Sequence, residues 1–241
     1  ATGNVLLDFD GLAGEVKPIT IQINGDIKIE FDELFNLLLS NLSDSFNGHL
    51  TIQAPTRTFT ITNDDSGIIS ITGVNGKEGE QDGSFTFSLP TGVTADTDIQ
   101  ISYNINGTAT DGGTDYTTSL PSPILLAAGQ NSITLNLAVN DDVILEDTET
   151  VELTAAVVNN ANGVTIPNLP QVIDILDNDN AFLTISTVPV TEGNAGAQTA
   201  SFTVTLSKST SSDFTIDYTT VDGTATQADA DGVSKILAAL R

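Results

Sequence analysis

The sequence predicts an all-β protein built of tandem antiparallel β-sandwiches, and three observations support this fold class. Several short segments alternate apolar and polar residues with a period of two, most clearly Ile99–Tyr103 and Ile133–Leu137. Thr, Asn, Asp and Gly, which favour short strands and tight turns, are abundant. The same sequence landmarks also recur along the chain, which indicates repeated units of one fold.

The internal repeat has a period of about 115 residues. An acidic segment that follows an apolar strand pattern occurs at 24–33 and again at 140–149. The other paired landmarks are 61–65 with 175–179, 69–79 with 183–193, 84–87 with 201–204, and 103–110 with 218–226. Because every pair has nearly the same separation, chance is a poor explanation for the similarity.

The repeat divides the chain at two places. Residues 1–66 are interpreted as the C-terminal half of one unit, 67–180 as a complete unit, and 181–241 as the N-terminal half of a third. Strands of the complete unit are expected near 68–73, 83–89, 98–106, 123–127, 132–140, 149–158 and 171–177. Seven short strands in about 115 residues are typical of an immunoglobulin-like sandwich of two packed sheets. No Pro-, Gly- or Ser-rich linker separates the units, so neighbouring units are expected to lie nearly end to end.

Two segments depart from the simple alternating pattern of the repeat. Between Phe31 and Leu42 the apolar residues form a helical stripe, but the repeat counterpart at 150–155 alternates as a strand. We therefore predict a strand there. The last residues, 233–241, depart from the repeat and fit either a helix or a truncated strand.

The composition excludes several classes of function. With 7 basic and 32 acidic residues the formal net charge is −25, which disfavours nucleic acid and anionic lipid as partners. The absence of cysteine excludes disulfides, thiolate metal sites and cysteine nucleophiles. No apolar run is long enough to span a membrane, so no direct membrane insertion is expected of this segment. Its start lacks the features of a signal peptide, although a targeting segment could precede it.

Acidic residues gather where two strands of the complete unit are expected to end. The segment Asn140–Glu149 holds five carboxylates, and the triplet Asp177–Asp179 follows the next strand pattern. Two carboxylates about 5 Å apart repel by roughly 3 kcal/mol at an effective dielectric constant near 20. Calcium takes about six to eight oxygen ligands, so converging acids predict a calcium site. In the alternative interpretation each acid points separately into water, but two acidic turns at recurring spacing disfavour it.

Together these residues resemble the Calx-beta family, which is named for the regulatory domains of sodium–calcium exchangers. The family pattern contains Glu-Gly, then Asp-Gly-Thr-Ala-Thr and Asp-Tyr, an acidic turn and a final acidic triplet. The corresponding residues are Glu78-Gly79, Asn106-Gly107-Thr108-Ala109-Thr110, Asp115-Tyr116, Asp141-Asp142 to Glu149, and Asp177-Asn178-Asp179. The resemblance covers nearly the whole chain. It implies a seven-stranded sandwich that binds Ca²⁺ at one end, at the junction with the next domain.

The resemblance also implies a set of calcium ligands, carried over position by position. The side chains are Glu78, Asp115, Asp141, Asp142, Glu146, Glu149, Asp177 and Asp179, joined by the backbone carbonyl of Ile144. Asn178 stands where the exchanger domain has a third aspartate, which would reduce the number of ions bound. In the first half-unit Gly25 replaces the first aspartate of the turn, and the retained acids are Asp26, Glu30, Glu33, Asp64 and Asp65. In the third unit the retained candidates are Glu192 and Asp231.

No enzymatic activity is expected. His49 is the only histidine and follows a turn, which disfavours a Ser-His-Asp triad or a histidine-based zinc site. A glycosidase pair of carboxylates would need a cleft and an aromatic platform that the sequence does not supply. We expect a calcium-stiffened segment of a large extracellular adhesin or filament on the bacterial cell surface. The alternatives are a module that binds polysaccharide or another surface protein, and a calcium sensor that regulates an attached domain.

Overall fold

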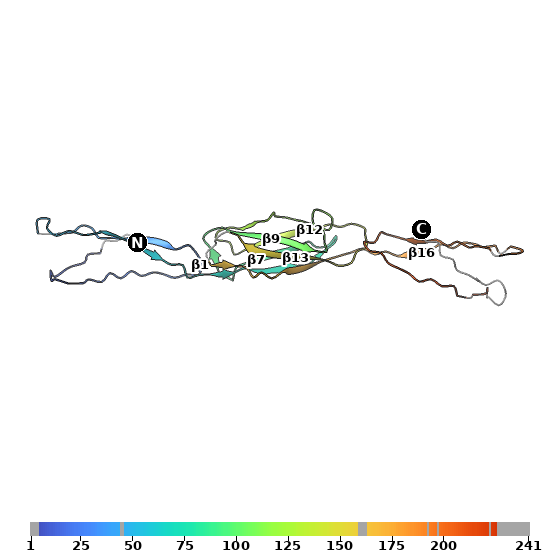
Figure 1. The fold of residues 1–241 in the computed structure, drawn as a ribbon, viewed down its shortest axis with the longest axis horizontal. Coiled ribbons are helices and arrows are strands. Elements are labelled where there is room, and N and C mark those ends of the chain that lie inside the picture. The colour runs from blue at the N-terminus through green and yellow to red at the C-terminus, as the bar shows by residue number, and fades with distance from the viewer. Residues whose placement is uncertain are drawn as a thin grey trace.

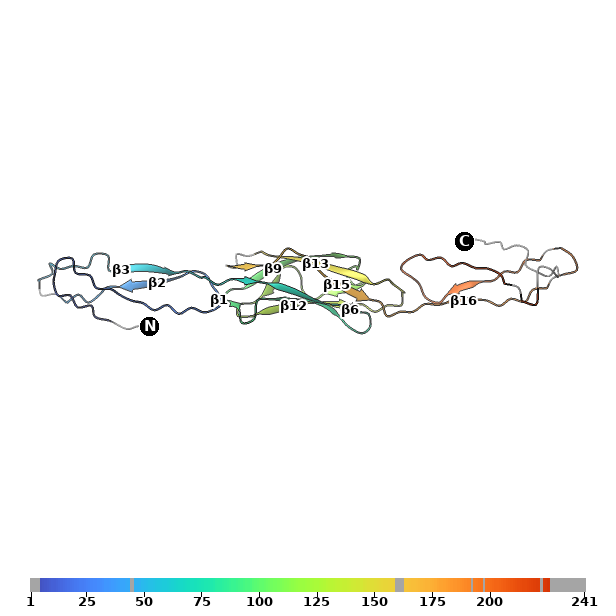
Figure 2. The ribbon, with the colours of Figure 1, turned by 90° about the horizontal axis from the view of Figure 1, so that it is seen from below.

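The computed structural model describes residues 5–43, 46–158, 163–191, 193–196, 198–221 and 223–225. These residues form a long rod with a two-layered β-sandwich in the middle (Figure 1). An open segment, interpreted from the sequence as a half-unit, extends from each end of the sandwich, and a view from below shows the same arrangement (Figure 2). The units thus lie end to end, as expected from the absence of linkers. No helix in the described ranges is long and apolar enough to cross a membrane.

The sandwich consists of a four-stranded and a five-stranded sheet. The first has the order β10-β12-β7-β5, with β10 at Tyr116–Thr118, β12 at Ser132–Val139, β7 at Gly83–Ser88 and β5 at Ser70–Val74. The second has the order β11-β9-β13-β15-β6, with β11 at Ile124–Leu126, β9 at Ile99–Gly107, β13 at Glu149–Val157, β15 at Gln171–Leu176 and β6 at Gly76–Lys77. Neighbouring strands are antiparallel except for β15 and β6. The predicted all-β fold class is confirmed.

Several short strands were missed by the sequence prediction. They are β6, β8 (Thr94–Ala95), β10 and β14 (Val164–Thr165), whereas β4 (Gly67–Ile68) overlaps the start of the strand expected near 68–73. Segments of two or three residues are too short to show an alternating pattern. The most important of them is β6, because after β5 the chain leaves the four-stranded sheet and joins the edge of the other sheet. The crossing is supported by the Asp174 amide, which donates to Asn75 Oδ1 at 3.1 Å.

The core lies between the two sheets and follows the predicted alternation. In β7 and β12, Phe85 and Leu135 are cross-strand partners, and both are fully buried. The opposing sheet contributes Ile99, Ile101, Val151, Leu153, Ile173 and Ile175. Each such side chain contributes about 1.5–3 kcal/mol by leaving water. Aliphatic and Phe side chains therefore supply the cohesion of the sandwich.

The half-units at the two ends of the rod are open hairpins. In the first, β2 (Glu33–Leu38) pairs with β3 (Thr56–Ile61), and the rings of Phe35 and Phe59 stack at 5.2 Å. The strand prediction for this segment is therefore confirmed. In the third unit β16 (Leu183–Ile185) pairs with β17 (Val204–Leu206).

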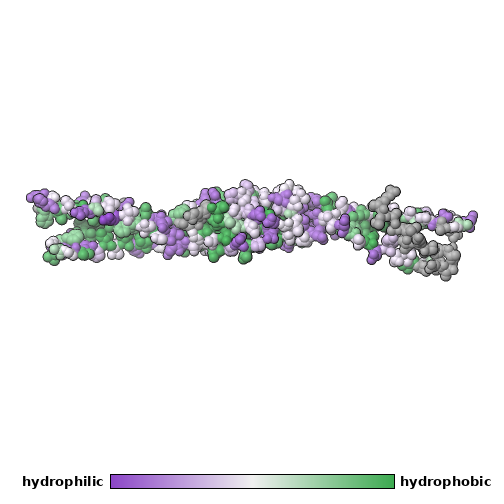
Figure 3. All heavy atoms as spheres, in the orientation of Figure 1, coloured by the Kyte–Doolittle hydropathy of each residue, from purple (hydrophilic) through white to green (hydrophobic). Residues whose placement is uncertain are grey.

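Apolar side chains gather on the visible surface of the N-terminal half-unit (Figure 3). Leu34 and Leu38, for example, are 69% and 60% exposed. The hairpin therefore leaves uncovered the kind of apolar surface that the complete unit buries between its two sheets. The sequence-based predictions for the third unit concern Glu192, Asp231 and 233–241, which lie outside the described residues.

Each end of the sandwich forms a joint with its neighbour through a parallel backbone contact. At the N-terminal joint, β1 (Lys28–Ile29) pairs with β8, and Ile29 enters the sandwich core. At the C-terminal joint, Leu145 of the acidic turn bridges to Thr210 of the third unit. The Leu145 amide donates to Ser209 O at 2.9 Å, and the Ser211 amide donates to Leu145 O at 3.0 Å.

Candidate metal centre

Glu78 is positioned by the short strand β6. This strand pairs with the end of β15, and the Glu78 amide donates to the Leu176 carbonyl at 3.0 Å. Glu78 therefore lies beside the acidic triplet that follows β15. The next residue, Gly79, has a φ of 63°, and a Cβ there would come within 2.9 Å of Asp141 Oδ1. Glycine thus permits both the left-handed backbone and the close approach of the acidic turn.

Hydrogen bonds tie the acidic turn between β12 and β13 to the triplet after β15. Asp177 Oδ1 accepts the Asp179 amide at 2.9 Å, and Asp177 Oδ2 accepts the Glu146 amide at 3.0 Å. Asp142 Oδ1 accepts the Ile144 amide at 2.7 Å, which folds the turn back on itself. These carboxylates therefore order the backbone that carries the neighbouring acids.

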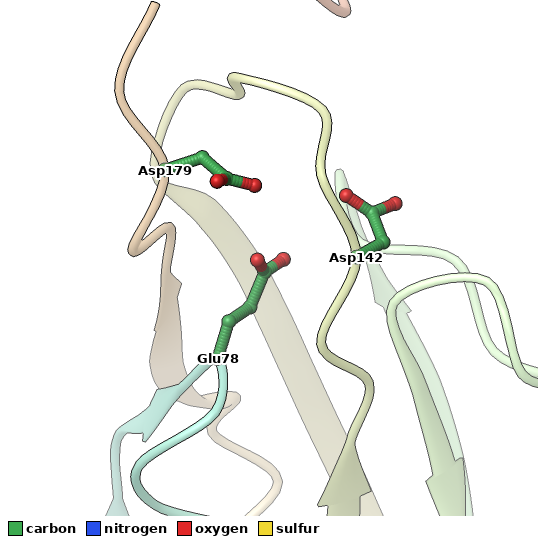
Figure 4. Close-up of side chains that lie close together, drawn as sticks. All are labelled: Glu78, Asp142 and Asp179. Carbon is green, nitrogen blue, oxygen red and sulfur yellow. The ribbon is translucent and has the colours of Figure 1, made fainter. Parts of the chain in front are cut away.

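The first of two carboxylate clusters contains Glu78, Asp142 and Asp179. Their side chains come from three separate segments and face one another, with oxygens within 4.8 Å (Figure 4). Glu78 is only 3% exposed. Glu78 Oε2 and Asp179 Oδ2 are buried and have no hydrogen-bond partner in the described part of the chain. Buried carboxylate oxygens without a partner are unfavourable, so the arrangement favours a bound cation.

The second cluster contains Asp115, Glu146 and Glu149, again with oxygens within 4.8 Å of one another. Asp115 is 8% exposed, and its Oδ2 accepts the Thr110 amide. The Asp115 amide in turn donates to Thr110 O at 3.1 Å, so the loop before β10 fixes this acid. Glu149 begins β13, and its Oε2 is buried and unpaired among the described residues.

The two clusters interact electrostatically. Burial raises the pKa of Glu78 to about 7, and nearby carboxylates add to this effect: Asp177, Asp142, Glu146 and Asp179. Burial, followed by Asp115, also raises the pKa of Glu149 to about 7. Glu146 of the second cluster helps to raise the pKa of Glu78 in the first. A cation bound in either cluster would therefore favour the charged form of the acids in both clusters.

The donor set fits calcium. Carboxylate oxygens are hard ligands, and oxygens within 4.8 Å of one another are no farther apart than the span of two Ca–O bonds of about 2.4 Å each. Magnesium requires shorter bonds in near-ideal octahedral geometry, which carboxylates from three separate segments supply poorly. The clusters contain no thiolate or imidazole, the ligands typical of zinc sites.

Six of the sequence-predicted ligands form the two clusters, and the other three lie close to them. Asp177 joins the acidic turn to the triplet through its two accepted hydrogen bonds. Asp141 is placed differently, because its Oδ1 accepts from the Asn178 side chain at 2.8 Å. Ile144 lies in the turn with its amide bonded to Asp142, and the role of its carbonyl stays a prediction.

Two side chains at the site make contacts that were not predicted from the sequence. The Asn178 amide group donates to both Glu78 O and Asp141 Oδ1, each at 2.8 Å. An aspartate could not donate these bonds, so Asn178 connects three segments rather than only lacking a charge. Lys208 of the third unit forms an ion pair with Asp179. It lies 29 residues further along the chain, and no motif marks it.

The chain matches the Calx-beta domain model three times, at residues 4–66, 62–185 and 174–233. It belongs to the Calx-beta family. The resemblance seen in the sequence is thereby confirmed. Calx-beta domains are β-sandwich modules that occur in tandem and bind calcium in homologues, and they are found in extracellular regions of membrane or surface proteins. The boundaries of the units in this Calx-beta chain, and its individual ligands, stay predictions.

Solved structures similar to this Calx-beta chain have low sequence identity to it. The apo form of the Calx CBD1 domain is 19% identical, with a TM-score of 0.36, over 48% of this chain and 100% of that one. CBD12 from CALX1.2 is 20% identical, with a TM-score of 0.33, over 45% of this chain and 44% of that one. A cohesin module from a Clostridium perfringens family 33 glycoside hydrolase is 18% identical, with a TM-score of 0.25, over 48% and 98%. No curated protein sequence matches the chain.

Proposed function

We propose that this chain is a calcium-binding, calcium-stiffened structural segment of a large extracellular bacterial adhesin or surface filament. The observation that carries the proposal is the convergence of six carboxylates beside the C-terminal joint. Buried oxygens of Glu78, Glu149 and Asp179 have no partner within the described residues. Calcium would neutralise the clusters and give these oxygens a ligand.

The acidic turn links the two clusters to the next unit. Asp142 and Glu146 lie on either side of Leu145, whose backbone bonds to the third unit. A cation held by these acids would restrict the turn and, with it, the joint. Without a cation, two carboxylates about 5 Å apart repel by roughly 3 kcal/mol at a dielectric constant near 20, which favours a looser turn.

The rod shape supports a spacer role. Units that lie end to end without flexible linkers can hold a distal region away from a cell surface (Figure 1). Extracellular calcium modules bind with dissociation constants of about 10⁻⁴–10⁻³ M, so a site of this kind fills as calcium reaches the millimolar range. Calcium would then keep such a spacer extended.

Spin-label distances across both joints test the stiffening directly. The chain contains no cysteine, so introduced cysteines are the only labelling sites. Thr72→Cys in β5 with Thr205→Cys in β17 spans the C-terminal joint, and Thr60→Cys in β3 with Thr72→Cys spans the N-terminal joint. All three side chains are exposed. Calcium should narrow the distance distribution across the C-terminal joint and leave the other unchanged.

The control is Asp142→Ala in the C-terminal pair, which removes one carboxylate from the first cluster. This variant should lose the calcium-dependent narrowing while the sandwich stays folded. If the chain that keeps Asp142 gives equally wide distance distributions in calcium and in chelator, the stiffening role is rejected, even if the chain binds calcium.

A direct ligand-binding role has less support. Two hollows in the described part of the chain have volumes of about 290 and 200 Å³. Tyr103 is the single aromatic residue in their linings, whereas ligand pockets are usually lined by apolar and aromatic side chains. A calcium-sensing role would use the same clusters, and it would require an attached domain that responds to the joint.

A further inference from the structure

The C-terminal joint supplies a cation of its own. Lys208, two residues after β17, forms an ion pair with Oδ1 of Asp179 in the first cluster. The Asp179 side chain is 7% exposed and the Lys208 side chain 35%, so the acid end of the pair is buried. Among the described residues, this is the only ion pair that reaches either cluster.

Backbone contacts on both sides fix the position of Lys208. Before it, the Ser207 amide donates to Phe182 O at 3.0 Å, and Ser207 Oγ accepts the Phe182 amide at 2.8 Å. After it, Ser209 O accepts the Leu145 amide at 2.9 Å. The docking of the third unit on the acidic turn therefore delivers the ammonium group to Asp179.

A single ammonium group satisfies the cluster only in part. Lys208 contacts Asp179 Oδ1, while Asp179 Oδ2 and Glu78 Oε2 stay without a partner among the described residues. One positive charge also faces three carboxylates. A divalent cation among the three would neutralise more of this charge than the lysine does.

We propose that Lys208 is a built-in competitor of calcium at the first cluster. The inference rests on the calcium binding proposed above and adds that a residue of the following unit sets the calcium affinity. Ammonium and calcium both neutralise Asp179, and two cations on one carboxylate repel each other. Calcium binding therefore displaces the ammonium group toward the solvent that the partly exposed lysine already reaches. Lys208 neutralises Asp179 in the calcium-free joint, and calcium takes over when it binds.

Calcium titration calorimetry of the full chain tests the competition with matched variants. Lys208→Gln removes the competitor and should tighten calcium binding about three- to tenfold. This is the change in affinity expected when calcium no longer has to break one partly buried ion pair. Lys77→Gln removes the same charge at the same end of the sandwich, but Lys77 pairs with exposed Glu80 at 2.6 Å. It should change the affinity by about twofold at most, because Lys77 neutralises an acid that lies outside both clusters and is 60% exposed. Lys208→Arg keeps the charge and should bind like wild type.

A second readout is thermal melting in chelator. Lys208→Gln should lower the midpoint of the calcium-free chain, because the cluster loses its neutralising charge, whereas Lys77→Gln should not. Equal calcium affinities of the two glutamine variants, or weaker binding by Lys208→Gln, would overturn the competition and leave the calcium site in place. A wild-type chain that binds no calcium would overturn the proposed function, and the competition with it.

Discussion

The two joints of the rod use equivalent segments of consecutive units, but different forces hold them. At the N-terminal joint Ile29 pairs with Ala95, and at the C-terminal joint Leu145 pairs with Thr210, in both cases in parallel. Ile29 and Leu145 occupy matching positions of the repeat. The backbone geometry of the joint is thus retained while the surrounding side chains change.

The N-terminal joint is apolar. Ile29 is 3% exposed and belongs to the sandwich core, and Gly67 leaves room for it, because a Cβ at Gly67 would lie 3.0 Å from Ile29 Cδ1. The acids of this turn have local partners. Glu30 pairs with Lys28 at 2.8 Å, and Asp26 accepts the Lys28 amide at 2.9 Å. Within the described residues no three acids at this joint bring carboxylate oxygens within 4.8 Å of one another.

The C-terminal joint is polar. Leu145 is only half-buried, and both carboxylate clusters draw acids from its turn. Lys28 holds the repeat position of Ile144, so the first turn carries its own counter-charge, whereas the second turn receives Lys208 from the next unit. The same backbone contact can therefore be held by a buried apolar side chain or by cations. We expect only the second joint to respond to calcium.

The largest effect should come from calcium itself, which should stabilise the chain through the C-terminal joint only. At 100 times its dissociation constant a ligand adds about 2.7 kcal/mol per site, hence about 5 kcal/mol if both clusters fill. Magnesium should add far less, because its octahedral preference suits the clusters poorly. Scanning calorimetry of the full chain in chelator, calcium and magnesium measures these gains. If calcium leaves the midpoint of thermal unfolding unchanged, neither joint binds the metal.

Truncation of the apolar contact should break the other joint. Ile29→Ala removes a buried side chain and should cost about 2–4 kcal/mol, equally in calcium and in chelator. Leu145→Ala at the matching position should cost only about 1 kcal/mol, because Leu145 is half-buried. Denaturant unfolding of both full-length variants compares the losses. Equal losses would show that the joints do not differ as described.

A change of pH should act on the calcium-free C-terminal joint. Glu78 and Glu149 have pKa values of about 7 in the folded chain against 4.5 in model compounds. The folded state therefore binds protons more tightly, so their contribution to stability is fully present below about pH 4.5 and is lost as the pH rises through about 7. The groups that face Glu78 are Asp142, Asp177, Asp179 and Glu146, with Lys208 on Asp179.

The calcium-free chain should thus lose on the order of 2 kcal/mol between about pH 5 and about pH 8, and the gain from calcium should grow over the same range. Thermal melts in chelator and in calcium across this range measure both trends. A flat profile in chelator would mean that the acids of the C-terminal joint do not repel one another.

Neutralisation of a single buried acid should have a smaller effect, with opposite signs in the two conditions. Glu78→Gln removes a carboxyl group whose pKa is raised by burial and, to a smaller extent, by four nearby carboxylates, so it should stabilise the calcium-free chain by about 1–2 kcal/mol. The same variant should lose part of the gain from calcium. Glu80→Gln, at an exposed neighbour, should change neither value by more than about 0.5 kcal/mol. Destabilisation by Glu78→Gln in chelator would argue against the repulsion at this joint.

Strands that alternate over several residues could be predicted from the sequence, and short ones could not. The alternation in β7, β9 and β12 is long enough to show which side chains enter the core, and the repeat decided between helix and strand for β2. In contrast, β6 has two residues and no readable period. Its pairing with β15 depends on the folded sandwich, yet this pairing brings Glu78 beside Asp177.

The candidate site could be predicted in composition but not in arrangement. The acids follow strand ends in a family pattern, so they could be named individually. Their division into two clusters depends on hydrogen bonds such as that between Glu146 and Asp177, which join segments 31 residues apart. Asn178 as a donor and Lys208 as a partner depend on tertiary contacts that leave no local pattern in the sequence.

Hydrogen exchange of the full chain, read at both joints in one sample, tests the contrast most directly. At the C-terminal joint the amides of Leu145, Glu146 and Ser211 are hydrogen-bonded, and at the N-terminal joint the Asp96 amide donates to Ile29 O at 3.0 Å. Calcium should slow exchange of the first three amides about tenfold or more and leave that of Asp96 unchanged. Equal slowing at both joints, or no slowing at the C-terminal joint, would contradict the claim that only the C-terminal joint depends on calcium.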